Sequence, residues 1–140
     1  MVPDGWNPEH PATIVDAALS QNHVFSSDPA VQFMTDLIAP YGEVKRRWTT
    51  AALDWNSGEY VQMNQTNCPF EDLPTCAMAS GSIPFVFQPR QWKGYVLADG
   101  GTVWNVNIDS AINQCIDAGY DSSDIIIDLA VCFYNNPSPQ

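Results

Sequence analysis

The chain has 140 residues, of which 45% are hydrophobic and 11% aromatic, enough to bury the core of one compact domain. Five Lys and Arg residues stand against 16 Asp and Glu residues, so the formal net charge at pH 7 is -11. A surface of that charge repels phosphate backbones, which argues against nucleic acids as partners. No apolar run approaches the roughly 20 residues of a membrane-spanning helix, so no transmembrane segment is predicted.

Residues 1–43 contain acidic residues and no Lys or Arg, and they predict a proline-containing helical arm. One helix is expected from Pro11 to about Ser20 and another from Asp28 to Ile38. In the second helix we expect Asp28 as the N-cap, because Pro29 after it suits the first helical position.

Residues 44–134 show a pattern in which strands dominate. The segments Arg47–Trp55 and Glu59–Met63 flank the turn residues 56–58, where Gly58 is available for a positive φ angle, and they predict a β-hairpin. Downstream, three short elements are expected: a helix at Leu73–Ser80, an apolar run at Phe85–Phe87 and a buried strand at Gly94–Ala98.

The last third of the chain predicts a helix followed by an interior strand. Apolar residues at helical spacing favour a helix from Asp109 to Ala118, closed by Gly119. The apolar run Asp124–Cys132 is typical of a strand buried on both faces. A strand, a helix and a strand in that order imply a parallel sheet. Residues 135–140 form a polar tail.

Asp99, at the end of the expected strand Gly94–Ala98, is the strongest candidate for a functional residue. Functional groups gather at the carboxyl ends of strands in α/β sheets, and Gly100 and Gly101 allow the backbone to turn sharply there. Asp99 is therefore placed as an orienting base. Asp-Gly-Gly is also a common turn sequence, so a purely structural role stays open.

The segments around Asp99 occur in an order that is typical of one family. Residues 77–89 carry an Ala-Ser segment and Ser-Ile-Pro-x-x-Phe-x-Pro, residues 94–101 run from a strand into Asp-Gly-Gly, and Asn105 precedes a helix. Over roughly residues 44 to 131 this combination resembles the C-terminal half of the patatin-like phospholipase domain. The resemblance implies an α/β fold: part of a three-layer domain with a mainly parallel sheet, its N-terminal part absent.

The resemblance also implies hydrolysis of a lipid acyl ester by a Ser-Asp dyad, with no cofactor and no metal. In the family a Ser in Gly-x-Ser-x-Gly is the nucleophile, a Gly-rich loop supplies oxyanion donors and an Asp is the base partner. By position Asp99 matches that Asp, with Gly100 and Gly101 completing its motif. The 140 residues contain no Gly-x-Ser-x-Gly, so we expect the Ser on a partner chain or a missing segment.

Two hypotheses on function follow. In the first, the chain is the C-terminal part of a lipid acyl hydrolase and is inactive alone. In the second, it is a non-catalytic remnant of the same fold that acts as a binding or assembly subunit, as the missing nucleophile suggests.

Other residues offer weaker candidates for catalysis. Ser80 and Ser82 flank Gly81, but Pro84 prevents the strand-to-helix turn that exposes a nucleophile. The histidines, His10 and His23, lie in the acidic arm, where a solvated side chain is the usual case.

Four tryptophans and one basic cluster could contact lipid. The tryptophans suit an acyl-chain groove as well as core packing; they are Trp48, Trp55, Trp92 and Trp104. Residues 45–47 (Lys-Arg-Arg) could bind lipid phosphate, or their side chains could be solvated or ion-paired at the start of the following strand.

Cys68 and Cys76 bracket a short Pro-rich loop and could close as a local disulfide, and Asn64-Gln65-Thr66 before it is a formal glycosylation acceptor. Both features favour a secretory or lumenal compartment, and a location at a membrane surface stays open as well. The alternative stays open that the cysteines are small buried residues and that the acceptor is fortuitous. The spacing of the cysteines is not that of a zinc site.

Overall fold

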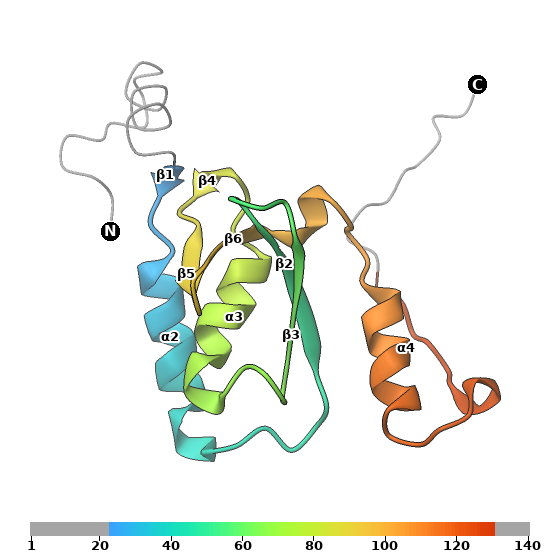
Figure 1. Ribbon diagram of the computed structural model, residues 1–140. Coiled ribbons are helices and arrows are strands. Elements are labelled where there is room, and N and C mark those ends of the chain that lie inside the picture. The colour runs from blue at the N-terminus through green and yellow to red at the C-terminus, as the bar shows by residue number, and fades with distance from the viewer. Residues whose placement is uncertain (1–22, 131–140) are drawn as a thin grey trace, which may run out of the picture.

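The structure, a computed structural model, describes residues 23–130 (Figure 1). These residues form a mixture of α-helices and β-strands joined by short 3-10 turns. In chain order the helices and strands are β1 (His23–Phe25), α2 (Asp28–Ile38), β2 (Thr49–Asp54), β3 (Tyr60–Asn64), α3 (Leu73–Ser80), β4 (Phe85–Phe87), β5 (Arg90–Trp92), β6 (Tyr95–Asp99) and α4 (Ile108–Ile116).

The main sheet has four strands in the order β3-β2-β6-β5, and each neighbouring pair is antiparallel. In the register of the two central strands, Ala52 lies opposite Asp99. The strands β1 and β4 form a separate parallel pair. The expectation of a mainly parallel sheet is therefore wrong for the described residues, although their mixed α/β character agrees with it. Short turns join β2 to β3 and β5 to β6 and allow only antiparallel pairing there, whereas the expected parallel pairing depended on a further strand after α4.

That further strand, expected at Asp124–Cys132, is not formed in the described residues. Residues 125–130 have no regular structure and are mostly exposed, with Ile126 90% accessible to solvent. An apolar run shows what a segment is able to bury, and a strand also needs a partner to pair with. The helix before it is confirmed as α4, and Gly119 follows with a φ of 91°.

The core lies between one face of the main sheet and α3. The side chains of Met63 and Leu97 from the sheet and of Cys76 and Ala79 from α3 are completely buried in it. Helix α2 packs in turn against α3, and Figure 1 shows α4 on the opposite side of the β2–β3 hairpin. Helix α2 has no buried residue and so lies on the outer side of α3; the domain boundary at residue 43 stays a prediction.

The hairpin of β2 and β3 is confirmed, and the buried carboxylate of Asp54 holds its turn. Its Oδ2 accepts hydrogen bonds from the Ser57 hydroxyl at 2.6 Å and the Ser57 N–H at 3.1 Å, and its Oδ1 accepts the Val96 N–H at 2.9 Å. These bonds, above all that of the Ser57 hydroxyl, lower the pKa of Asp54. Gly58 supplies the positive φ, 74°, that the turn requires.

Helix α2 has the expected bounds, but its N-cap is Ser27 and not Asp28. The Ser27 carbonyl already accepts the N–H groups of Ala30 and Val31, both at 3.1 Å, so Asp28 is the first helical residue. The Asp28 carboxylate pairs with the Arg90 guanidinium, whose hydrogen bond lowers the pKa of Asp28. The helix expected at Pro11–Ser20 lies outside the described residues.

Cys68 and Cys76 form a disulfide, which agrees with the first of the two alternatives for these residues. The bridge ties the turn after β3 to α3, and both cysteines are buried. Cys115 is free and half-buried, and Cys132 lies outside the described residues. No helix of residues 23–130 is both long and apolar enough to span a membrane.

Loss of this disulfide is expected to destabilise the chain by about 2–3 kcal/mol, because it closes a short loop in the unfolded state. Urea unfolding of the Cys68→Ala/Cys76→Ala variant measures the loss. Cys115→Ala is the matched control, since it removes a thiol without opening a loop. An unchanged urea midpoint in the double variant would show that the bridge does not restrict the unfolded chain.

Candidate functional site

Asp99 is the last residue of β6, and its backbone and side chain are both held in place. Its N–H donates to the Ser82 carbonyl at 2.8 Å, which joins the end of β6 to the segment after α3. Its Oδ1 accepts the Gly101 N–H at 2.7 Å. The Oδ2 atom accepts no hydrogen bond from the described residues. One carboxylate oxygen thus fixes the orientation of the side chain while the other remains available.

A cavity of about 360 Å³ opens beside Asp99, and hydroxyl, amide and aromatic side chains line it. Two polar atoms of its lining residues, Thr49 Oγ1 and Asn107 Nδ2, are buried without a hydrogen-bond partner among the described residues. No Lys, Arg or His is among the described residues that line it. These residues are Thr49, Thr50, Ala51, Tyr60, Ser80, Asp99, Gly100, Gly101, Trp104, Asn105 and Asn107.

The two glycines after Asp99 serve different purposes. A Cβ on Gly100 would lie 2.6 Å from the Ala51 carbonyl oxygen, so only glycine fits between β6 and β2 there. A Cβ on Gly101 would meet side-chain oxygens of Asn105 and Asp99, at 3.0 and 3.1 Å. Gly100 thus allows the close strand contact, and Gly101 supplies the N–H that orients Asp99.

Tyr60, the first residue of β3, lies in the same cavity. Its hydroxyl donates to the Trp104 carbonyl at 3.3 Å, and the two rings have centroids 6.0 Å apart. Burial, followed by the negative charge of Asp99, raises the pKa of Tyr60. The sequence pointed to Tyr60 only as part of the hairpin. The signal that places it in the site is the register in which β2 lies between β3 and β6.

The two serines that flank Gly81 lie in different surroundings. Ser82 is completely buried and its hydroxyl donates to the Met78 carbonyl at 2.7 Å, so it is not available as a nucleophile. Ser80, the last residue of α3, lines the Asp99 cavity. Ser80, a weak candidate from the sequence, therefore lies at the same cavity as Asp99, although no hydrogen bond joins the two residues.

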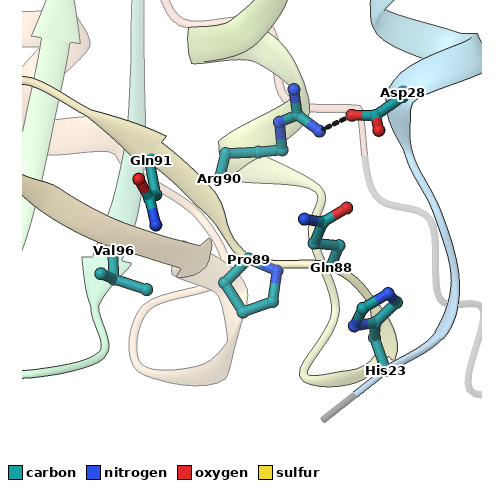
Figure 2. A pocket seen from close by; sticks show the side chains of 7 residues that line it. All are labelled: His23, Asp28, Gln88, Pro89, Arg90, Gln91 and Val96. Carbon is teal, nitrogen blue, oxygen red and sulfur yellow. Dashed lines mark hydrogen bonds and ion pairs between the residues drawn. The ribbon is translucent and has the colours of Figure 1, made fainter. Parts of the chain in front are cut away.

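His23 is not part of the Asp99 site. It lies in β1 and lines a different cavity, of about 530 Å³, together with Asp28 and Arg90 (Figure 2). His10 lies outside the described residues. The residues 23–130 contain no cluster of His, Cys, Asp and Glu side chains that could hold a metal ion.

The four tryptophans do not form one groove. Trp48 packs against the core, and Trp92 is buried with its Nε1–H donating to Asp72 at 3.0 Å. Trp55 is 43% exposed and contacts the ring of Phe85, so only Trp104 of the four lines the Asp99 cavity. Core packing therefore explains two of them. In the basic cluster, Arg47 donates to the Gln114 carbonyl at 3.4 Å.

Comparison with protein families gives a match that covers more than half of the chain. The sequence model of the patatin-like phospholipase family matches residues 6–112. The chain belongs to the patatin-like phospholipase family. The match starts well before the region of resemblance seen in the sequence and includes β1, α2 and the Asp99 cavity. A comparison with curated proteins found no match. The mixed α/β fold is compatible with this family of lipid acyl hydrolases.

Gly100→Ala is expected to destabilise this patatin-like chain by about 1–3 kcal/mol, the usual effect of overpacking against atoms that cannot move. Gly101→Ala is the matched control, because the oxygens its Cβ meets belong to side chains that can rotate. Urea unfolding of both variants measures the difference. Equal losses would show that β6 and β2 can separate to admit a Cβ.

Replacing Asp99 by Asn is expected to lower the pKa of Tyr60, because a negative charge near the hydroxyl disfavours the tyrosinate. The pKa should stay above the ordinary value of 10.0, since burial is the larger cause of the shift. A titration followed by NMR of ¹³Cζ-labelled tyrosine measures it, with the exposed Asp36→Asn as control. A Tyr60 pKa that does not change in Asp99→Asn would mean that water screens the two groups from each other.

Proposed function

We propose that this chain supplies the acidic half of a Ser-Asp dyad that hydrolyses lipid acyl esters, with Asp99 as the base partner of the Ser. The observation that carries the proposal is the geometry of the carboxylate. Its Oδ1 is held by the Gly101 N–H, whereas its Oδ2 has no partner among the described residues and lies beside a cavity.

Asp99 would act on a serine hydroxyl placed in this cavity. Oδ2 takes the hydroxyl proton as the serine oxygen attacks the ester carbonyl, and the proton then passes to the departing alcohol. Water hydrolyses the acyl-serine in a second step by the same route. Gly100 and Gly101 support this chemistry by placing and orienting the carboxylate.

The nucleophile and the oxyanion donors would come from outside the 140 residues, which contain no Gly-x-Ser-x-Gly. We therefore infer a partner chain, or a segment of a longer protein, that brings this motif against the Asp99 cavity. Residues 44–134 would then be the C-terminal part of the catalytic domain, and residues 1–43 an arm on its surface.

A non-catalytic role is the second candidate, and one observation favours it. The apolar side chains of Ile126, Ile127 and Leu129 are 90%, 47% and 52% exposed. Such a segment suits an assembly surface of a remnant that keeps the fold and has lost the reaction.

The test is fluorophosphonate labelling of the full chain together with every chain that co-purifies with it, followed by intact mass. We expect the label on a Ser of Gly-x-Ser-x-Gly in a second chain or segment. Asp99→Asn should reduce ester hydrolysis by the assembly about 10²–10⁴-fold, and it should leave the fold intact because the Asn Oδ1 still accepts the Gly101 N–H.

Asp36→Asn is the matched control, since Asp36 is an exposed carboxylate of α2 outside the cavity. Full hydrolysis by the Asp99→Asn assembly would remove Asp99 from the mechanism. No label on any chain, while a control serine hydrolase is labelled, would favour the assembly role.

A further inference from the structure

The turn that follows β3 carries a second chemical feature, separate from the Asp99 site. It begins with Asn64-Gln65-Thr66, the only Asn-x-Ser/Thr in the 140 residues whose middle position is not Pro. Asn64 is the last residue of β3, and β3 is an edge strand of the main sheet. The acceptor thus lies at the margin of the sheet, where a bulky group does not interrupt its central strands.

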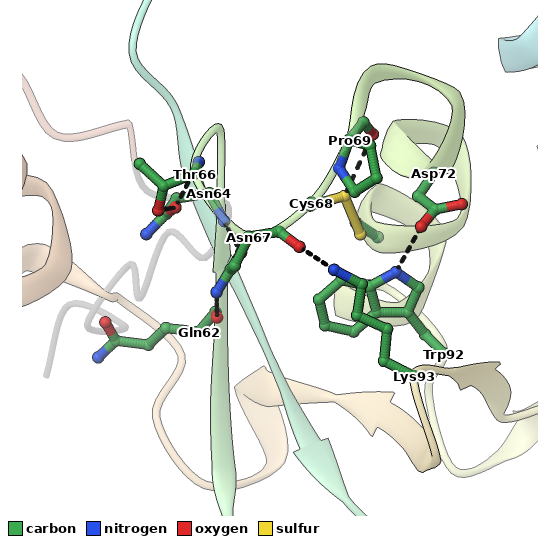
Figure 3. Close-up of a disulfide and its surroundings, with 10 residues drawn as sticks. Gln62, Asn64, Thr66, Asn67, Cys68, Pro69, Asp72, Trp92 and Lys93 are labelled. Carbon is green, nitrogen blue, oxygen red and sulfur yellow. Dashed lines mark hydrogen bonds between the residues drawn. A yellow bond between two sulfur atoms is a disulfide. The ribbon is translucent and has the colours of Figure 1, made fainter.

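Hydrogen bonds within this turn involve the side-chain carbonyl oxygen and the backbone N–H of Asn64. The Asn64 Oδ1 accepts both the N–H of Thr66, at 2.9 Å, and the Thr66 hydroxyl. The backbone N–H of Asn64 donates to Asn67 Oδ1 at 2.8 Å. The Asn64 Nδ2 has no partner among the described residues, and Figure 3 shows it pointing away from the strand. The nitrogen that would carry a glycan therefore makes no hydrogen bond, among the described residues, that a glycan would break.

The disulfide lies directly beside this acceptor (Figure 3). The Cys68 N–H donates to the Asn64 carbonyl at 2.8 Å, and Cys68 is bonded to the fully buried Cys76. Disulfides form and persist in oxidising compartments such as the endoplasmic reticulum lumen. N-glycosylation of Asn-x-Ser/Thr occurs in secreted proteins as well. Two independent features of one turn thus point to the same compartment.

We propose that Asn64 is an N-glycosylation site and that the chain folds in an oxidising, glycosylating compartment. In the modification, Asn64 Nδ2 forms a bond to the anomeric carbon of a lipid diphosphate-linked oligosaccharide. The bond from that carbon to the diphosphate oxygen breaks, Nδ2 loses one proton, and the lipid diphosphate leaves. The Asn67 side chain already bonds the Asn64 N–H and the Gln62 carbonyl at the edge of β3, and a glycan at Asn64 would add bulk that hinders pairing with a strand of another molecule.

The test is expression of the full chain behind a cleavable leader in eukaryotic secretory cells. A glycosidase that releases N-glycans converts the glycosylated Asn to Asp, so peptide mass spectrometry identifies the residue that carried the glycan. Chain from both the medium and the cell lysate is measured, so that retention of a misfolded variant does not hide the result. Leader removal and the Cys68–Cys76 disulfide report entry into the lumen.

We expect Asp at position 64 after glycosidase treatment of the parent chain, and one glycan fewer in Asn64→Gln and Thr66→Ala. Thr66→Ser is the matched control and should keep the glycan, because Ser preserves the hydroxyl of the acceptor. A chain that has lost its leader and formed the disulfide but keeps an unmodified Asn64 would overturn the proposal. A glycan that persists in Thr66→Ala would overturn it too.

Discussion

The antiparallel pairing of β6 with β2 is the constraint on which the site depends. It sets Ala52 opposite Asp99, and it brings Gly100 so close to the Ala51 carbonyl that a Cβ would lie 2.6 Å from the oxygen. Because β2 also pairs with β3, the same register brings Tyr60 into the cavity. A carboxylate at the end of a strand becomes part of a site only because two neighbouring strands fix what lies around it.

The electrostatics of the cavity disfavour an anionic group. Among the described residues its only charged side chain is that of Asp99, in a chain whose formal net charge is -11. An anionic group placed in the cavity would be repelled by Asp99, whereas an uncharged group would not. Burial and the Asp99 carboxylate both disfavour a negative charge on the Tyr60 hydroxyl, and together they raise the pKa of Tyr60.

The disulfide and the acceptor turn serve a different part of the molecule. The Cys68–Cys76 bridge ties the end of β3 to α3, on which the core face of the sheet packs. Lys93 donates to the Asn67 carbonyl and so joins the same turn to the loop between β5 and β6. These contacts stabilise the sheet at its β3 edge. The proposed glycan at Asn64 would lie outside the Asp99 cavity.

Sequence by itself determined the local elements and the main candidate residue. The Asp28-Pro29 start located α2, helical spacing located α4, the turn residues around Gly58 located the hairpin, and the strand ending in Asp99 was recognised from its glycines. These are properties of neighbouring residues, so a linear pattern contains them. Strand direction, the partner of each strand and the residues that share the cavity depend on contacts between distant segments. Within residues 23–130 the mainly parallel sheet and the strand expected from Asp124 onward were therefore predicted wrongly, and only the tertiary structure brought Tyr60, Ser80 and Asn107 to Asp99.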